Sequence, residues 1–463
     1  RLLGEMSRLN GIMNIEPGVD ADQLSELFIS RLSQRGVQLT HEQFIAVTEP
    51  LSRVYAIPDH LHALTHMLGD GLVPSNAKAG YLARMLARRI LRMRDDLGLD
   101  VSLSELINHH LDVNMHGHEM KQTRDGLLTI MNLEEERYTE VLRKGTNLIN
   151  QSLKSVAKDA EQLPDELLFQ LNDSHGLPPD MVINMAQSSG WTHLRLRTGF
   201  SAEMAERHAR LAKAAAASTQ QTSLVDELPS FPETVPLYYN DVQQRSFDAS
   251  VLASIPLREG VGPDGATHAI VLSESCFYPE GGGQEGDYGS LTTDGTSRLV
   301  LDTQKEDGLI LHLCDGPFEV GDLVHGAIDW LRRKQLMDHH TAVHIVGGAA
   351  RKILGPHIYQ AGANKSTDLA RLDITHYRRL ARDDLDAIEI LANKVLGQVS
   401  RTEKTILPRH EADKKYGFDL YQGGAPKGNE IRVLRISDHD VQACGGTHHD
   451  EPGKIGSIRV VRS

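Results

Sequence analysis

The sequence predicts a multidomain α + β protein, with an all-helical N-terminal region, a small β-barrel and a C-terminal α + β domain. Two observations lead to this prediction. Apolar residues recur at helical spacing up to about residue 212, and after Pro236 they form short strand-like runs separated by Gly and Asp. The chain has 463 residues. At ~150 residues per domain, that length suggests about three domains, each able to bury its own core.

Composition excludes several classes of protein. Hydrophobic residues make up 40% of the chain and charged residues 24%, which excludes a largely disordered protein or a fibre. The formal net charge of −14 argues against a uniformly basic nucleic-acid-binding surface. Three cysteines are too few for a disulfide framework and indicate a reducing compartment. No apolar run reaches roughly 18 residues, so no membrane-spanning helix is expected.

The helical region is predicted over residues 1–214, and a linker rich in Ala, Ser, Thr and Gln over 215–235. Apolar spacing predicts helices over about residues 82–93, 103–111, 127–153 and 202–217. Proline disfavours helix interiors, so five sites are expected to lie between helices. They are Pro50, Pro58, Pro74, Pro164 and Pro178–Pro179.

The barrel is predicted at residues 236–330 and the α + β domain at 331–463. Short β-branched and apolar runs predict barrel strands at 237–239, 247–249, 269–272, 299–301 and 309–313. The C-terminal domain is expected to contain helices at 331–354 and 382–399 and strands at 431–436 and 458–461.

The strongest chemical pattern is a pair of motifs about 100 residues apart. His340 and His344 lie one turn apart on a predicted helix, so both imidazoles share a face. Cys444 and His448 flank a Gly-Gly-Thr turn that is flexible enough to aim both side chains at one point. These residue types suit a tetrahedral Zn²⁺ site, although four unconnected side chains are the alternative. Thr341 replaces the Glu of a metalloprotease motif, which argues against a peptidase.

A second pattern is the run from Phe277 to Gln284, which contains three consecutive glycines after a predicted strand. Glycines allow backbone N–H groups to approach a ligand closely. The run lacks the GK[ST] ending of a P-loop. A simple glycine hairpin is the alternative interpretation.

A third pattern is a basic segment at residues 78–94 in which no acidic residue occurs. Its arginines at 84, 88 and 92 recur every four residues and form a ladder on one helix face. Such a face on an acidic chain indicates binding to nucleic-acid phosphates. A solvated face paired with acidic residues elsewhere is the alternative.

Taken together, these motifs resemble alanyl-tRNA synthetases, and more closely their archaeal type. The resemblance covers nearly the whole chain. It is carried by residues 339–344 (HHTAVH), 444–448 (CGGTH), 277–284 (FYPEGGGQ), 70–76 (DGLVPSN), 80–84 (GYLAR), 171–178 (LNDSHGLP) and 370–377 (ARLDITHY). The last of these segments is the one that indicates the archaeal type.

The resemblance implies that the helical region recognises the acceptor stem of the alanine tRNA. Asn76 and Asp173 match the residues that read its G·U wobble pair, whose donor and acceptor pattern an amide and a carboxylate can sense. Arg84, Arg88 and Arg92 would hold phosphates without reading sequence. The alternatives are that Asn76 caps a helix and that Asp173 is a turn residue.

The resemblance also implies an editing domain that hydrolyses Ser or Gly wrongly esterified to the tRNA. Ser275 would hydrogen-bond a serine side chain, and Asp373 would meet the substrate ammonium group. Gln284 would line the substrate pocket of the editing site beside them. The backbone of Gly281, Gly282 and Gly283 would line the pocket. One Zn²⁺ per chain would be bound by His340, His344, Cys444 and His448.

The class II adenylation motifs do not occur in this sequence, and the chain begins at Arg1 without an initiator methionine. We therefore expect a fragment that lacks the adenylation domain, where ATP and Mg²⁺ would bind, and the C-terminal domain. The parent would attach alanine to its tRNA in the cytoplasm, with no membrane partner, and would dimerise through the C-terminal domain. Two alternatives are a free-standing trans-editing deacylase and a zinc-stabilised tRNA-binding module without activity.

Overall fold

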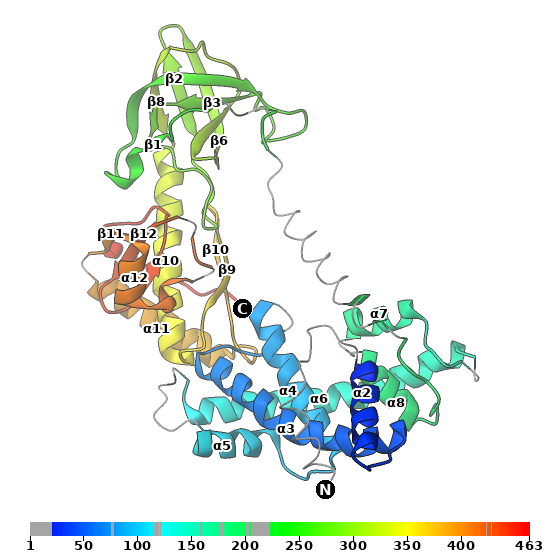
Figure 1. Ribbon diagram of the computed structural model, residues 1–463. Helices are drawn as coiled ribbons and strands as arrows, with labels where there is room; N and C mark the ends of the chain where they lie inside the picture. The colour runs from blue at the N-terminus through cyan, green and yellow to red at the C-terminus, as the bar shows by residue number, and fades with distance from the viewer. Residues whose placement is uncertain are drawn as a thin grey trace. The chain divides into compact units, whose positions relative to one another are not determined.

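The computed structural model of the chain describes residues 21–463, except 76–77, 115–119, 121, 158–159, 176, 178, 198, 201–202, 205–222, 227, 229, 400, 423 and 427. The chain divides into two units, residues 1–196 and 197–463 (Figure 1). Most of the helix predicted at 202–217 and much of the predicted linker lie outside the described residues. Within the described ranges, no helix is long and apolar enough to cross a membrane.

The first unit is built mainly of helices in its described part. Predicted helices at 82–93, 103–111 and 127–153 are confirmed as α4, α5 and α6. The elements are α2 (Ala21–Gln34), α3 (His41–Gly69), α4 (Lys78–Asp96), α5 (Leu103–Asn114), α6 (Arg124–Ser152), η1 (Leu153–Ser155), α7 (Asp165–His175) and α8 (Pro179–Ser188). Their buried face includes Leu64 and Leu68 of α3, Ile90 of α4, Ile107 of α5 and Leu127 of α6.

The prediction that Pro50 and Pro58 lie between helices is wrong, because both lie inside α3. Each proline removes one helical N–H donor, which weakens the helix locally. The 29-residue helix nevertheless begins with a Thr40 capping box and buries Leu61, Leu64 and Leu68 along one side. Burial of this apolar side outweighs the local cost of the prolines.

The second unit begins with the predicted barrel. Six antiparallel strands close in the order β2-β3-β7-β6-β5-β8. Along β2 the inward side chains alternate with exposed ones, so Phe247, Ala249 and Val251 enter the barrel core. The barrel strands are β2 (Ser246–Pro256), β3 (His268–Leu272), β5 (Gly289–Thr293), β6 (Thr296–Glu306), β7 (Leu309–Cys314) and β8 (Leu323–Ile328).

The prediction of a strand at 237–239 is wrong, because these residues form the 3₁₀ helix η2 (Leu237–Tyr239). The preceding strand β1 (Val235–Pro236) is only two residues long and pairs with β4 (Glu274–Ser275). Proline has no N–H group to extend the ladder. The turn of η2 instead buries Tyr238 against Tyr278.

The rest of the second unit is the predicted α + β region. The long helix α10 leaves the barrel and runs beside the β9–β10 hairpin (Figure 1). Buried side chains of α10, α11 and β12 form its core, among them Ile345, Ile388 and Leu434. The elements are α10 (Trp330–Leu354), β9 (Gln360–Lys365), β10 (Ala370–Ile374), α11 (Arg382–Gln398), β11 (Glu403–Pro408), α12 (Arg409–Tyr416), η3 (Phe418–Leu420), β12 (Glu430–Ile436), β13 (Asp440–Ala443) and η4 (Pro452–Ile455).

The prediction of a strand at 458–461 is also wrong, since this segment has no regular secondary structure. Its backbone groups are paired with side chains of α11 instead of with a neighbouring strand. Ile458 exchanges two hydrogen bonds with the Asn393 amide, at 2.7 and 2.9 Å, and the Val460 N–H donates to Glu389 at 2.7 Å. These side chains satisfy the backbone that a ladder would otherwise pair.

A buried ion pair joins the barrel to α10. Arg333, in the first turn of α10, contacts Asp287 between β4 and β5, and neither side chain is exposed to solvent. Arg333 Nε donates to both Asp287 oxygens at 2.9 and 3.0 Å, and Nη2 also donates to the Cys276 carbonyl. The Asp287 Oδ2 atom, which Arg333 contacts, also accepts the Tyr278 N–H at 2.6 Å. The loop between Cys276 and Asp287 is therefore held against α10.

Replacing Arg333 with Met would leave the Asp287 carboxylate buried without a cation. We expect the free energy of unfolding of the second unit to fall by about 3–5 kcal/mol. Urea unfolding followed by Trp330 fluorescence, in a Trp191→Phe background, measures this because the chain has two tryptophans.

The matched control is Arg382→Met, which breaks an exposed pair with Asp386 and should cost at most about 1 kcal/mol. The double variant Arg333→Met/Asp287→Leu should recover most of the loss. Equal losses in the single and double variants would contradict the role of the buried charge.

Candidate metal centre

Four ligand-type side chains from two distant segments converge at one point of the second unit. His340 and His344 extend from successive turns of α10, and Cys444 and His448 come from the loop after β13. One ligand atom from each lies within 4.8 Å of all the others. The three imidazoles are buried and Cys444 is partly buried. The structure thus brings together all four residues predicted to be ligands.

The distances in the cluster fit a metal ion. Cys444 Sγ lies 3.2 Å from His448 Nε2 and 3.4 Å from His340 Nε2. Ligand bonds of ~2.0 and ~2.3 Å at tetrahedral angles place nitrogen and sulfur roughly 3.5 Å apart. Two of the donor atoms therefore already lie at ligand spacing from the sulfur.

The Nδ1 atom of each imidazole is directed to a partner outside the cluster. His340 Nδ1 donates to Gln284 Oε1 at 2.7 Å, because an amide oxygen can only accept. His344 Nδ1 lies 3.3 Å from the Asp440 carboxylate, and His448 Nδ1 lies 3.5 Å from the Thr341 hydroxyl. Such outer partners fix the ring orientation and leave Nε2 for a metal.

The charges in the cluster also favour a cation. Burial raises the pKa of the Cys444 thiol, but His340, His448 and His344 lower it more, so that it ends well below its usual range. Burial lowers the pKa of His340 to about 4, although Cys444 raises it. A thiolate therefore faces a neutral imidazole whose Nε2 carries a lone pair. Burial lowers the pKa of His344, but Cys444 and Asp440 raise it more, to about 9, so a proton on His344 or a metal ion can supply the positive charge that faces the thiolate.

The Gly-Gly turn is needed for close packing at Gly446. A Cβ at Gly446 would lie 2.1 Å from His340 Cε1, which is inside the ring's contact distance. Gly445 is less restricted, since its Cβ would meet the Tyr239 hydroxyl at 3.3 Å. Arg432 Nη1 donates to the Cys444 and Gly446 carbonyls at 2.7 and 3.0 Å and so stabilises the turn from the other side.

The three-glycine loop presents Gln284 to the cluster by lying directly on β9. Gly283 has φ +76°, and a Cβ there would lie 2.1 Å from the Ala363 carbonyl oxygen. Lys365 binds the loop through both its backbone and its side chain. Its N–H donates to the Gly283 carbonyl at 2.6 Å, and its buried ammonium donates to the Gly282 carbonyl at 2.7 Å. Gln284 Nε2 then donates to Thr447 Oγ1 at 2.8 Å.

Two other predicted substrate residues have partners elsewhere. Ser275 is buried, and its hydroxyl lies 2.7 Å from His312 Nε2. Asp373 is partly exposed on β10 and lies 3.2 Å from Arg371. Among the contacts of the described residues, neither side chain touches the four-residue cluster.

The predicted tRNA-reading residues belong to the first unit. Asn76 lies outside the described residues, and Asp173 lies on α7 with a side chain that is also outside them. Arg84 Nε and Arg88 Nε contact Glu134 on α6 at 3.0 and 3.2 Å.

The Glu134 side chain is 1% exposed, so Arg84 and Arg88 compensate a buried charge. The third member of the ladder, Arg92, is half-buried on the same helix. The phosphate-binding role of the three arginines stays a prediction.

Sequence reasoning missed several residues that support the cluster. Thr447 lies within the CGGTH motif, and its hydroxyl position could have suggested a hydrogen-bonding role. Asp440, Lys365 and Arg432 belong to none of the sequence motifs. Because they act through contacts between distant segments, the local sequence carries no sign of their roles.

Comparisons with known proteins agree with the observed architecture. A family described as tRNA synthetases class II (A) matches residues 8–332, and the threonyl and alanyl tRNA synthetase second additional domain matches residues 431–463. The second match contains Cys444 and His448. His340 and His344 lie between the two matched regions.

The chain is similar to several archaeal proteins named alanine–tRNA ligase. Those of Pyrococcus furiosus and Thermococcus kodakarensis are each 41% identical, over 100% of this chain and 49% of the relative. The protein of Halobacterium salinarum is 42% identical over 97% of this chain and 45% of the relative. The chain therefore spans about half the length of the curated relatives it matches.

The cluster predicts that the protein binds about one metal ion per chain and that Cys444→Ser lowers this content, because a hydroxyl is a poorer ligand than a thiolate. Elemental analysis after dialysis against a weak chelator measures the ratio. Cys276→Ala, at a buried barrel cysteine, is the matched control and should keep the metal. Full retention of metal by Cys444→Ser would contradict the assignment.

Gly446→Ala should weaken metal binding about 10- to 100-fold, because the new methyl group displaces His340 or the loop. Competition with a chromophoric chelator measures the affinity. Gly445→Ala, one residue earlier with a 3.3 Å contact, should change it little. Similar losses in both variants would indicate a general effect on the turn rather than a clash with His340.

Proposed function

The chain belongs to the class II (A) family of tRNA synthetases, and we propose that it is the part of an alanine–tRNA ligase that recognises the tRNA and hydrolyses mischarged tRNA. Similarity to alanine–tRNA ligases along the chain supports the assignment to alanine. The observation that carries the hydrolytic role is the convergence of Gln284 and four ligand-type side chains at one buried point.

We propose that the metal is zinc, with one ion held by the four-residue cluster. A thiolate with three imidazoles is a donor set that suits Zn²⁺. Bound there, zinc would hold the four side chains around one centre and add a positive charge beside the ester. Four protein ligands leave no open coordination position, so we infer an organising role.

The chain's own groups would position the substrate. Gln284 contacts both His340 and Thr447, so it is the proposed pocket residue nearest the cluster. The peptide groups of Gly281, Gly282 and Gly283 would line the pocket beside it. In the reaction, water adds to the ester carbonyl carbon and the ribose oxygen leaves with a proton. Ser275 and Asp373 remain proposed contacts for the substrate hydroxyl and ammonium groups.

The proposed substrates are tRNA molecules that carry Ser or Gly in place of Ala. These amino acids differ from alanine by one hydroxyl or one methyl group, which a single binding pocket discriminates weakly. A second, hydrolytic site supplies the missing selectivity.

The proposed RNA partner of the first unit is the acceptor stem of the alanine tRNA, with its G·U wobble pair. Asn76 and Asp173 would read the pair, and Arg84, Arg88 and Arg92 would position phosphates. Because Arg84 and Arg88 already contact Glu134, RNA would have to share or replace this acceptor.

We further propose that the whole protein attaches alanine to tRNA, with ATP and Mg²⁺ bound in an adenylation domain outside this chain. The relatives are about twice as long as this chain, which supports a longer parent. A homodimer formed outside this chain and a cytoplasmic location complete the proposal. Three free thiols suit a reducing compartment.

The test of the editing function is deacylation of Ser-, Gly- and Ala-tRNA bearing the alanine acceptor stem. The protein should hydrolyse the first two and spare the third. His340→Ala should lower the rate at least about 100-fold, because a lost ligand disorganises the pocket.

His339→Ala is the matched control, since His339 is adjacent but lies outside the cluster and contacts the Ser366 carbonyl. It should keep activity. A folded, metal-loaded wild-type protein that binds the tRNA without hydrolysing any ester would identify a binding module and refute the editing proposal.

A further inference from the structure

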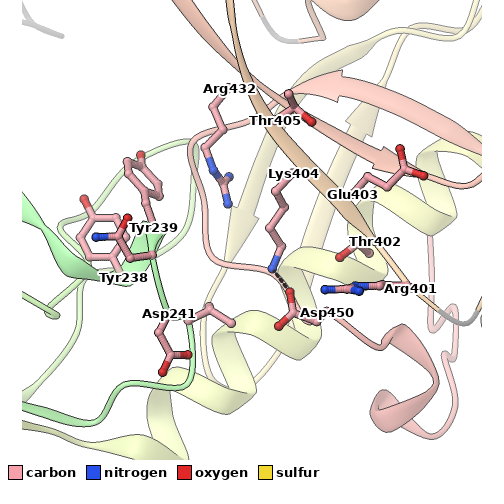
Figure 2. A pocket seen from close by; sticks show the side chains of 12 residues that line it. Tyr238, Tyr239, Asp241, Arg401, Thr402, Glu403, Lys404, Thr405, Arg432 and Asp450 are labelled. Atoms are coloured by element: carbon pink, nitrogen blue, oxygen red, sulfur yellow. Dashed lines mark hydrogen bonds and ion pairs between the residues drawn. The ribbon is translucent and has the colours of Figure 1, made fainter.

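A hollow lies near the loop at residues 444–448, which carries Cys444 and His448. It has a volume of about 610 Å³ and is lined by the segment before the barrel, by β11 and by the chain around Asp450. Figure 2 shows Arg432 and Lys404 reaching into it beside Tyr239. Arg401, Asp241, Glu403 and Asp450 also line it.

Three residues that line the hollow contact the backbone of residues 444–448, called the cluster loop below. Lys404 Nζ donates to the His448 carbonyl at 2.8 Å, and the Tyr239 hydroxyl donates to the Gly445 carbonyl at 3.0 Å. Arg432 donates to the carbonyls of Cys444 and Gly446. Lys404, Tyr239 and Arg432 thus connect the hollow to the loop that carries Cys444 and His448.

Three basic and three acidic side chains line the hollow, and two of the acidic ones are paired with cations. Lys404 is neutralised by Asp450 at 2.6 Å. Glu403 also lines the hollow, but its carboxylate lies 3.5 Å from Arg435, and Figure 2 shows it directed away from Lys404. Asp241 accepts the N–H of Gln243 at 2.8 Å. Two guanidinium groups, on Arg401 and Arg432, therefore face one remaining carboxylate.

Arg432 is oriented so that it can donate to the oxygens of an anion. Its guanidinium group lies over the Tyr239 ring, 4.8 Å from the centroid, so contact with the ring restricts the orientation of the guanidinium plane. One nitrogen, Nη1, serves the loop carbonyls, while the guanidinium has five N–H donors in all. The remaining donors suit the oxygens of a phosphate. Tyr239 is 38% exposed and offers an aromatic surface to a nucleotide.

We propose that this hollow binds a phosphodiester of the single-stranded 3′ end of the tRNA, next to the nucleotide whose aminoacyl ester lies at the four-residue cluster. The proposal rests on the proposed editing function and adds an RNA-binding site to it. It explains why cations and an aromatic ring gather behind the cluster loop. RNA is favoured over a free nucleotide because the hollow adjoins the loop that would hold the terminal ester.

The experiment compares two esters, seryl-adenosine and a seryl-CCA trinucleotide, of which only the second contains phosphodiesters. The quantity measured is the ratio of their kcat/KM values. Arg401→Ala and Arg432→Lys should each lower this ratio about tenfold, through the KM of the trinucleotide, because a charge-assisted hydrogen bond is lost. The slope of the logarithm of the trinucleotide binding constant against the logarithm of the salt concentration should decrease by the equivalent of about one phosphate contact.

Arg435→Ala is the matched control, since Arg435 lies on β12, pairs with Glu403 and is not among the residues that line the hollow. It should leave the ratio unchanged. Equal losses on both esters in Arg401→Ala and Arg432→Lys would show that these residues act only through the loop and would overturn the proposal. Unchanged ratios would overturn it too. Competitive inhibition by AMP that depends on Arg401 would identify a mononucleotide site instead.

If the wild-type protein hydrolyses neither ester, the editing proposal fails by itself. Anisotropy of a fluorescent, unacylated CCA trinucleotide then tests the hollow directly. Binding that weakens about tenfold in Arg401→Ala and not in Arg435→Ala supports the phosphate site. Equal affinities in all three proteins would refute it.

Discussion

The second unit depends on one buried ion pair, in which Arg333 of α10 holds Asp287 of the loop after the three glycines. Neither charge reaches solvent, so each needs the other to offset its desolvation. Arg333 and His340 are two helical turns apart and share a face of α10, while Asp287 follows Gln284 closely in the chain. The pair therefore sets the register in which Gln284 meets His340. A shift of the loop along the helix would break both contacts together.

The cluster is assembled by close approaches of backbone to side chain. Gly446 leaves room for the His340 ring, and Gly283 allows the loop to lie on β9. Both positions exclude a Cβ for reasons of space, so the glycines in two separate motifs serve one centre. Lys365 and Arg432 then hold the two loops through their carbonyl oxygens. Rigid surroundings of this kind reduce the reorganisation that ligand or substrate binding would require.

The first unit shows how one sequence pattern can serve two purposes. The arginine ladder of α4 has the spacing of a phosphate-binding face, yet Arg84 and Arg88 contact the buried Glu134 of α6. This contact joins two helices of the unit and leaves a carboxylate that competes with any phosphate. Regular spacing alone does not distinguish packing from binding, because both place the arginines on one face.

By itself the sequence determined the order of helical region, barrel and α + β region, and it brought His340, His344, Cys444 and His448 into one hypothesis. These features rest on local periodicity and on residue types at short spacing, which are properties of the chain itself. Only the tertiary structure decided that Pro50 lies inside a helix, that Ser275 faces His312, and that Asn393 replaces a strand partner at residue 458. It also decided which groups hold each imidazole at Nδ1. The physical reason is that these outcomes depend on burial and on hydrogen bonds between segments far apart in sequence, and the free energy of such long-range interactions outweighs the local preference of the chain.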